Sequence, residues 1–229
     1  MKKSIVFVFM VLIFVLAAFS SAGAQSKKYI TLGRYEQDNN VSNGPEEIEW
    51  LVLAENLGWG DSNDKYALIV SRYVLDGKPY NETKEDVTWE TSSIRKWLNN
   101  DFCNSAFTQS EKDQIGLFKV GTRDNPDYHT SGGNITSGDR IILLSYDEII
   151  NYMPVSSRRC EATAYARTKG ISLMDNETGI VGWATRTPGS KSWGVVTVDP
   201  DHDGTFYMPG GVVQATYGIR PALYIKWNN

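Results

Sequence analysis

The residues best suited to hold a metal ion lie near the C-terminus, in the run Asp199-Pro200-Asp201-His202-Asp203-Gly204. Alternate carboxylates can converge on one hard cation, and a D-x-D-x-D-G run opens the calcium loops of EF-hands. The twelfth position of such a loop falls here on Gly210, and strand-like sequence flanks the run. Asp199, Asp201 and Asp203 are therefore candidate calcium ligands, with an ordinary hairpin turn as the alternative.

A second group of candidates combines two tryptophans with two arginines. Trp183 and Trp193 flank a loop that begins at Arg186, so their rings either pack beneath the loop or line a groove for a sugar or peptide. Arg186 is either a polar anchor for such a ligand or the ion-pair partner of a strand neighbour. Arg220 interrupts the last strand-like segment, where a guanidinium with five donors is suited to clamp loops through an ion pair. These four are the candidate ligand-binding residues.

No catalytic residue is predicted. The sequence contains no G-x-S-x-G, H-E-x-x-H or phosphate-loop motif, and the two histidines, His129 and His202, lie in turn-rich sequence without a motif around them. Glutamate clusters at 46–49 and 82–86 have nothing that would fix the separation of two carboxylates for glycoside hydrolysis. No cofactor is expected apart from the possible calcium ion.

The N-terminus has the three parts of a secretory leader. Lys2 and Lys3 precede an apolar run over residues 5–19, and Ala22-Gly23-Ala24 follows as a small-residue cleavage site. The apolar run is shorter than the about 18–20 residues that span a bilayer, so no stable membrane insertion is expected after cleavage. We therefore expect a signal peptide over residues 1–24, one domain over 25–229, and a secreted, periplasmic or cell-envelope location.

The charge balance argues against nucleic acid and against an anionic membrane as partners. The chain has 23 basic and 27 acidic residues, and the leader contains two of the lysines, so the mature charge is 21 − 27 = −6. No cluster of Lys and Arg is evident in the sequence, as a nucleic-acid surface would require. Seven tryptophans and 12 tyrosines suit carbohydrate or peptide sites as well as cores. The expected partner is an extracellular glycan or protein.

Cys103 and Cys160 are the two cysteines of the chain. In an exported protein an even number permits one disulfide. Each cysteine also lies in helix-like sequence, where a small buried side chain is ordinary. The sequence does not decide between a disulfide and two small buried side chains.

Strand signals dominate the first and last thirds of the sequence. Residues 29–33, 48–53 and 66–71 are predicted strands, and the last two should form a hairpin with Trp59 at its tip. The last third contains predicted strands at 181–186, 193–198 and 205–208, a turn at 209–211, and a closing strand over 217–225 that is broken at Arg220-Pro221.

Helix signals occupy the middle third. Thr91 or Ser92 can cap a helix with Ile94, Trp97 and Leu98 on one face. Capping boxes begin at Thr108 and at Ser145, the latter with Ile149 and Ile150 inward, and a fourth helix is predicted over 158–169. A long loop at 121–138 and a short strand at 140–144 separate them. Strands, helices and strands again, without βαβ alternation, predict an α+β fold.

Six stretches together resemble one family. They are 48–53, 87–99, Phe107 with Glu111-Lys112, 143–145, 183–189 and 218–223. The series resembles a bacterial family of secreted domains of unknown function, written six-two-seven-three, and covers nearly all of the mature chain. That family is in turn similar to the C-type-lectin-like fold of the formylglycine-generating-enzyme type. Where the family commonly has Trp-Trp-Leu-Arg-Ser-Pro-Gly, this chain keeps one tryptophan, Trp183.

The resemblance implies a C-type-lectin-like single domain of antiparallel strands, a few helices and long loops, in which the N- and C-terminal strands pair. It does not imply copper-dependent oxidase chemistry, because Cys103 and Cys160 lie too early and too far apart in the sequence. The expected function is a secreted, non-enzymatic module that binds a carbohydrate or protein ligand. An extracellular enzyme and a structural envelope component are the alternatives.

Overall fold

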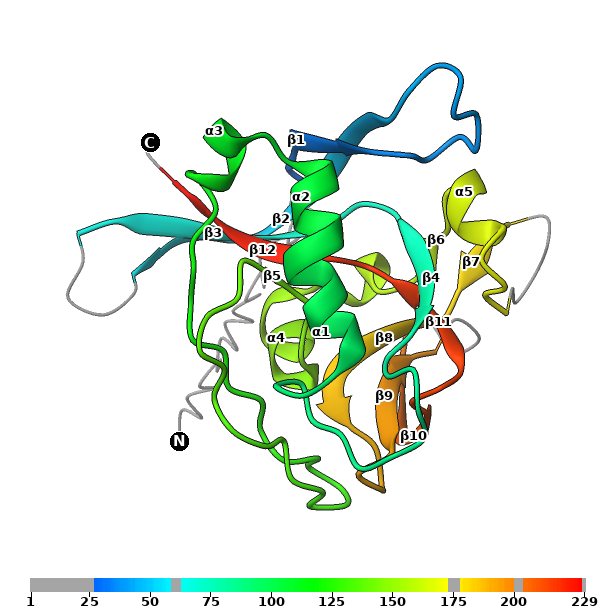
Figure 1. Ribbon diagram of the computed structural model, residues 1–229. Helices are drawn as coiled ribbons and strands as arrows, with labels where there is room; N and C mark the ends of the chain where they lie inside the picture. Colours follow the sequence, from blue (N-terminus) through cyan, green and yellow to red (C-terminus); the bar gives the residue numbers. More distant parts are fainter. Residues whose placement is uncertain (1–26, 59–62, 173–177, 200–203, 228–229) are drawn as a thin grey trace, which may run out of the picture.

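The structure, a computed structural model, describes residues 27–58, 63–172, 178–199 and 204–227 (Figure 1). The predicted leader and Trp59 lie outside these ranges. No helix within them is both long and apolar enough to cross a membrane. The order of strands and short helices confirms the α+β prediction.

The first sheet has the strand order β1-β2-β3-β12-β5, and each neighbouring pair is antiparallel. Its strands are β1 (Tyr29–Tyr35), β2 (Glu46–Gly58), β3 (Lys65–Ser71), β12 (Ala222–Lys226) and β5 (Ile141–Ile142). The predicted hairpin is confirmed as β2 and β3, whose β-branched and aromatic residues suit a buried pleated surface. β1 pairs with β2 and not with β12, so the implied pairing of the terminal strands is wrong.

The second sheet has the order β10-β9-β8-β11-β4. Its strands are β10 (Phe206–Val212), β9 (Gly194–Val198), β8 (Trp183–Pro188), β11 (Thr216–Ile219) and β4 (Asp76–Pro79). β8 and β11 meet in parallel at Trp183 and Gly218, whereas the other pairs are antiparallel. A separate antiparallel pair joins β6 (Cys160–Glu161) to β7 (Ile180–Val181).

The predicted closing strand is two strands that belong to different sheets. β11 ends at Ile219 in the second sheet, and β12 begins at Ala222 in the first. Pro221 cannot donate to a ladder, and its carbonyl accepts a hydrogen bond from the Ser71 N–H at 2.9 Å. Arg220-Pro221 is therefore the crossing point between the two sheets.

Short helices pack against both sheets. They are α1 (Ser93–Trp97), the π-helical turn η1 (Leu98–Phe102), α2 (Cys103–Ala106), α3 (Gln109–Lys112), α4 (Tyr146–Tyr152), the 3₁₀ turn η2 (Val155–Ser157) and α5 (Ala164–Arg167). Of these, α2 packs against β1 of the first sheet and α5 against β4 of the second. Ser92 caps α1, and complete capping boxes at Thr108 and Ser145 begin α3 and α4, as predicted. Ile149 is buried as expected, but Ile150 is 45% exposed.

Two segments differ from the prediction because of pairing with distant residues. The helix expected over 158–169 is reduced to α5, since Cys160 and Glu161 pair with β7 instead. The turn expected at 209–211 lies inside β10, where a register shift against β9 marks a bulge and Gly210 has a φ of +77°. In both cases pairing with another strand overrides the local signal.

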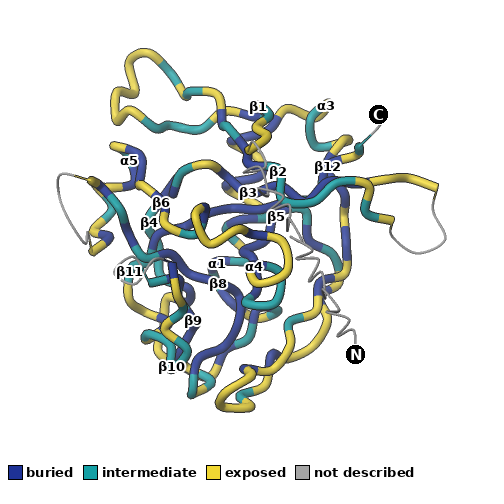
Figure 2. Tube along the Cα trace, turned by 180° about the vertical axis from the view of Figure 1, so that it is seen from behind, coloured by how far each residue is buried: buried dark blue, intermediate teal, exposed yellow. Residues whose placement is uncertain are grey.

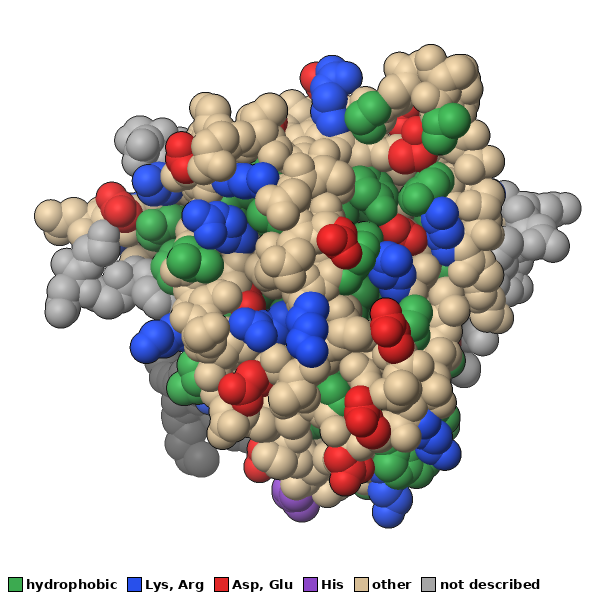
Figure 3. All heavy atoms as spheres, in the orientation of Figure 1, with side chains coloured by type: hydrophobic (Ala, Val, Ile, Leu, Met, Phe, Trp, Pro, Cys, Tyr) green, Lys and Arg blue, Asp and Glu red, His purple; other side chains and the backbone are tan. Residues whose placement is uncertain are grey.

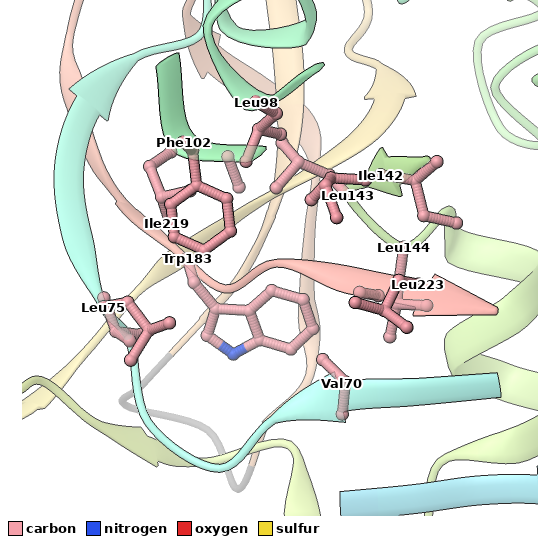
Figure 4. Packing of buried hydrophobic residues seen from close by; sticks show 14 of the residues in the cluster. Val70, Leu75, Leu98, Phe102, Ile142, Leu143, Leu144, Trp183, Ile219 and Leu223 are labelled. Atoms are coloured by element: carbon pink, nitrogen blue, oxygen red, sulfur yellow. The ribbon is translucent and has the colours of Figure 1, made fainter. Parts of the chain in front are cut away.

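One continuous cluster of buried residues joins the sheets to the helices. Figure 4 shows Trp183 near its centre, with Leu75 and Ile219 on one side and Val70 and Leu223 on the other. Side chains alternate across the first sheet, so neighbours in β2 face opposite ways. The Trp50 ring lies 6.2 Å from that of Phe107 on the side of α2, whereas Leu51 faces a pocket lined by Ser157 of η2.

Candidate functional site

Arg220 is the predicted site residue whose surroundings are most unusual. Only 2% of the residue is exposed. Its Nε donates to the Ser71 carbonyl and its Nη1 to the Ser157 carbonyl, both at 2.9 Å, and Nη1 also lies 3.8 Å from Met153 Sδ. In the described chain no carboxylate pairs with it, so the expected ion pair is replaced by carbonyl contacts. Carbonyl dipoles stabilise the cation without neutralising it.

Trp183 lies directly behind this guanidinium. The Arg220 Cζ is 5.2 Å from the centroid of the Trp183 ring, a cation–π contact. The ring is fully buried, and its Nε1 donates to the Arg158 carbonyl at 2.8 Å. Trp183 therefore belongs to the core and positions Arg220 from behind; in this structure its face is not open to a ligand.

A pocket of about 400 Å³ opens beside Arg220, on the side of the first sheet where Ser156 and Ser157 of η2 lie. Figure 2 shows the molecule from behind, with β3 of this sheet as a mostly buried strand. The residues that line it come from six parts of the chain and are mostly polar: Lys27, Tyr29, Leu51, Arg72, Tyr73, Ser156, Ser157, Arg159, Cys160, Glu161, Ile180 and Arg220. We call this the Arg220 pocket. Arg220 forms part of its buried floor, and Lys27, Arg72 and Arg159 are exposed residues of its wall.

The charge of the Arg220 pocket is positive. Four cationic residues line it against one carboxylate, that of Glu161. Arg72 is also paired with Glu49 at 2.8 Å and lies 5.1 and 5.0 Å from the ring centroids of Tyr29 and Tyr73. The lining therefore contains more basic than acidic side chains, although the overall charge of the chain is −4. An anionic group would be attracted to this pocket.

Ser157 and Cys160 complete the interior of the pocket. The Ser157 hydroxyl is buried and has no hydrogen-bond partner, which is unusual for a buried polar group. The Cys160 thiol donates to the Arg72 carbonyl at 3.2 Å. Burial raises the pKa of Cys160 more than the nearby Arg220 cation lowers it, so the thiol stays neutral at physiological pH. The lining of the pocket thus includes a buried hydroxyl without a hydrogen-bond partner among the described residues, next to a cation without a carboxylate partner among them.

Arg186 does not line the Arg220 pocket. Its Nη1 and Nη2 donate to the two carboxylate oxygens of Glu148, which makes a bidentate ion pair, and Nη1 also donates to the Leu143 carbonyl at 2.7 Å. Burial alone would raise the pKa of Glu148, but Arg186 and the capping bonds from Ser145 outweigh it and hold that pKa below its ordinary value. Arg186 therefore ties β8 to α4, the ion-pair alternative for this residue.

Trp193 lies apart from the other candidates. It precedes β9 and is 36% exposed, with Lys84 Nζ 4.4 Å from its ring centroid. The structure thus brings Trp183 and Arg220 together but places Arg186 and Trp193 elsewhere. The four residues do not converge on one cleft.

Asp199 is the one predicted calcium ligand that the structure describes. It follows β9, and its N–H donates to the Thr205 carbonyl at 2.7 Å, as in a hairpin connection. Asp201 and Asp203 lie outside the described residues. Within the described ranges, one group of three carboxylates comes close enough to share a cation, Glu36, Asp38 and Glu46, and it is far from these aspartates in sequence.

The two cysteines do not form a disulfide. Cys103 lies in α2 and Cys160 in β6, and both are buried free thiols. Burial raises the pKa of Cys103 as well. Of the two alternatives that the sequence left open for these cysteines, the structure shows small buried side chains and not a disulfide.

Most residues of the Arg220 pocket could not be predicted from the sequence as site residues. Lys27, Arg72, Arg159 and Arg220 are scattered over the chain, so no basic cluster is visible until the fold assembles them. The weak local signal was the pair Arg158-Arg159 after two serines. Nothing in the sequence shows that Ser157 lacks a hydrogen-bond partner.

Comparison with known proteins gives one positive result. No curated protein and no solved structure gives a significant match to the chain. One family model, described as a domain of unknown function (DUF6273), matches residues 64–227. The matched region includes Arg72, Arg159 and Arg220, whereas Lys27 and Tyr29 precede it. Because the match extends over more than half of the chain, this protein belongs to the DUF6273 family of domains of unknown function.

Proposed function

We propose that this protein is an exported, non-enzymatic binding module that recognises an acidic extracellular glycan in the Arg220 pocket. One observation carries the proposal. Arg220 is a buried cation at the floor of an open pocket, and its described partners are carbonyls and a thioether, not a carboxylate. A buried charge is normally paired, and an incoming anion would supply the partner.

A carboxylate suits the donors that remain. The hydrogen bonds of Arg220 within the described chain use Nε and Nη1, so Nη2 is left for a ligand. The buried Ser157 hydroxyl, which has no hydrogen-bond partner among the described residues, would be a second donor once a bound anion reaches it. Guanidinium groups bind carboxylates through strong charge-assisted hydrogen bonds, and Arg159 and Lys27 add charge at the pocket wall.

Aromatic side chains favour a sugar as the carrier of this carboxylate. Tyr29 and Tyr73 line the pocket on either side of Arg72, and Tyr29 is 38% exposed. Aromatic faces stack on the apolar faces of sugar rings, while their hydroxyls add hydrogen bonds. An acidic peptide is the alternative ligand that the experiment must distinguish.

Location and fold ancestry belong to the same proposal. Residues 1–24 support export to the periplasm or the cell surface. A diverged C-type-lectin-like fold is supported by the α+β composition, the antiparallel sheets and the long loop that precedes β5. The separation of β1 from β12 would be the point of divergence.

The experiment is a ligand screen with purified protein that starts at Gln25. The arrays should contain uronate-bearing glycans, their neutral counterparts and acidic peptides. The variant is Arg159→Gln, which changes an exposed pocket residue, and the matched control is Lys191→Gln, an exposed cation in the loop between β8 and β9. Both should fold as the parent does, because neither side chain is buried.

We expect binding to uronate-bearing glycans, no binding to the neutral ones, and loss of signal in Arg159→Gln alone. Binding of acidic peptides alone would mean that the ligand is a protein and not a glycan. No binding in any arm would favour a structural envelope role, and turnover of a bound glycan would make the protein an enzyme. Each of the last two outcomes would overturn the proposal.

A further inference from the structure

A second basic pocket lies on the opposite side of the first sheet from the Arg220 pocket. It has a volume of about 480 Å³ and runs beside α1, η1 and α2. Its lining residues are Arg95, Lys96, Asn99, Asn100, Cys103, Asn104, Gln109, Lys112, Leu117, Gly138 and Arg140. Figure 3 shows Lys and Arg side chains gathered on the face of the molecule that carries these helices. We call it the helix-side pocket.

No acidic residue lines this pocket, although acidic residues outnumber basic ones in the chain. The lining contains four cations, and only Arg95 has a carboxylate partner among the described residues. Arg95 Nε donates to Asp139 at 2.6 Å, and this fully buried carboxylate also accepts from Trp89 Nε1 at 2.9 Å. Arg95 is therefore a neutralised part of the wall.

Lys96, Lys112 and Arg140, the other cations of the lining, have no ion-pair partner within the described chain. Lys112 Nζ donates to the side-chain oxygen of Asn104 at 2.8 Å, and Arg140 Nε donates to the Lys112 carbonyl at 3.4 Å. Both partners are neutral, so these contacts orient the side chains without cancelling their charge. Lys96 is exposed at the rim and forms no ion pair within the described chain. Lys112, Arg140 and Lys96 thus bring three positive charges to one pocket, and of these Lys96 also lies near the Glu85 carboxylate.

The frame of the pocket is fixed by Asn99. Its side-chain oxygen accepts from the Arg140 and Ile141 N–H groups at 2.8 and 3.1 Å, and its Nδ2 donates to the Arg95 and Ile141 carbonyls at 3.1 and 2.8 Å. Asn99 lies in the π-helical turn η1, a type of turn that is rare and frequent at functional sites. The cations are therefore presented by a rigid framework.

We propose that the helix-side pocket binds a tetrahedral oxyanion, a phosphate or sulfate group. A phosphate group brings close to two negative charges and three strong acceptor oxygens, which match three cations better than a single carboxylate does. The nearby Cys103 thiol does not oppose an anion, because its burial keeps it protonated. This inference does not depend on the Arg220 pocket, which shares none of these lining residues.

The test is calorimetric titration with inorganic phosphate and with sulfate at constant ionic strength, chloride being the reference ion. The variant is Lys112→Gln/Arg140→Gln. The control is Lys119→Gln, an exposed cation of the same region outside the pocket. Circular dichroism and melting without phosphate establish that each variant folds, and Lys96→Gln at the exposed rim is a milder variant should the double one fail.

We expect saturable binding of phosphate or sulfate by the parent and the control, and a loss of about tenfold or more in affinity in the double variant. Sedimentation with phosphatidylglycerol vesicles then identifies the source. Co-sedimentation that phosphate competes away indicates a lipid headgroup, and phosphate binding without co-sedimentation indicates a soluble or polymer-borne group; either supports the site. No saturable binding by the parent, or equal affinity in the parent and the variants, would overturn it.

Discussion

At the scale of single residues, two buried arginines have opposite surroundings. Arg186 is neutralised by Glu148 in a bidentate pair, whereas Arg220 is held by carbonyls of Ser71 and Ser157. From the sequence alone both are arginines in strand-like segments, and an ion pair is the natural expectation for either. The two arginines differ in the group that the fold places beside the guanidinium. This group could not be predicted for Arg220, because its partner Ser71 is 149 residues away in the sequence.

The Arg186–Glu148 pair should make the protein acid-sensitive. The pKa of Glu148 is below its ordinary value of 4.5, so the pair contributes stability fully above about pH 4.5 and loses it as the pH falls through the lower folded-state pKa. Glu148→Gln should cost about 3–5 kcal/mol at pH 7, because it leaves Arg186 buried without its anion.

Urea unfolding from pH 7 to pH 3 measures this effect. The difference in the free energy of unfolding between the parent and Glu148→Gln should become smaller as the pH falls from 7 to 3. Glu47→Gln is the control, since its side chain is 62% exposed and its ion pair with Arg34 should contribute at most about 1 kcal/mol. A gap that stays constant down to pH 3 would contradict the assignment.

The Ser157→Ala variant distinguishes an effect on ligand binding from an effect on stability. Because its buried hydroxyl has no partner, Ser157→Ala should leave the free energy of unfolding unchanged or slightly increased. Thermal and urea unfolding would check this. Destabilisation by more than about 1 kcal/mol would mean that the hydroxyl is already satisfied in the free protein.

At the scale of elements, helix caps could be predicted from the sequence, whereas the pairing of distant strands could not. The capping boxes at Thr108 and Ser145 involve residues three apart, so the sequence alone locates both helix starts. The pairing of Cys160 with Val181, and the passage of the last strands between two sheets, depend on distant segments. No periodicity within 158–169 or 217–225 contains that information.

The contact between β8 and β11 gives an element-scale prediction. A Cβ added at Gly218 would lie 2.8 Å from the Gly182 carbonyl oxygen and 2.9 Å from Val74, where backbone cannot easily move. Gly218→Ala should therefore destabilise the protein by about 1–3 kcal/mol. At Gly58 the nearest atom is the flexible Lys65 Nζ at 3.4 Å, so Gly58→Ala should change stability by less than about 1 kcal/mol.

Melting temperatures of the two alanine variants, measured side by side, distinguish these effects. Equal melting temperatures would show that β8 and β11 can move apart without cost. Such a result would also weaken the view that Arg220 is rigidly placed, since it directly follows β11.

At the scale of the whole molecule, an acidic chain presents two basic pockets on opposite sides of its first sheet. The α+β class was predicted correctly from the sequence. It did not predict the pockets, because each collects cations from separate segments. Of the four proposed ligand residues, Arg220 alone lines the Arg220 pocket, and Trp183 supports it from the core.

The free thiols predict how the whole protein responds to redox conditions. Cys103 and Cys160 are buried in different elements and unpaired, so a reducing agent should not change the melting temperature. Differential scanning calorimetry with and without dithiothreitol measures this. A drop of several degrees on reduction would indicate a disulfide between the two cysteines.

The central claim is that the Arg220 pocket recognises a carboxylate, and calorimetric titration with an oligouronate tests it most directly. The parent and Lys191→Gln should bind the oligouronate and not its neutral counterpart. Ser157→Ala and Arg159→Gln should each weaken binding by about tenfold, with melting temperatures close to that of the parent. Equal affinity of the parent for the acidic and the neutral oligosaccharide, or unchanged affinity in both pocket variants, would contradict the account.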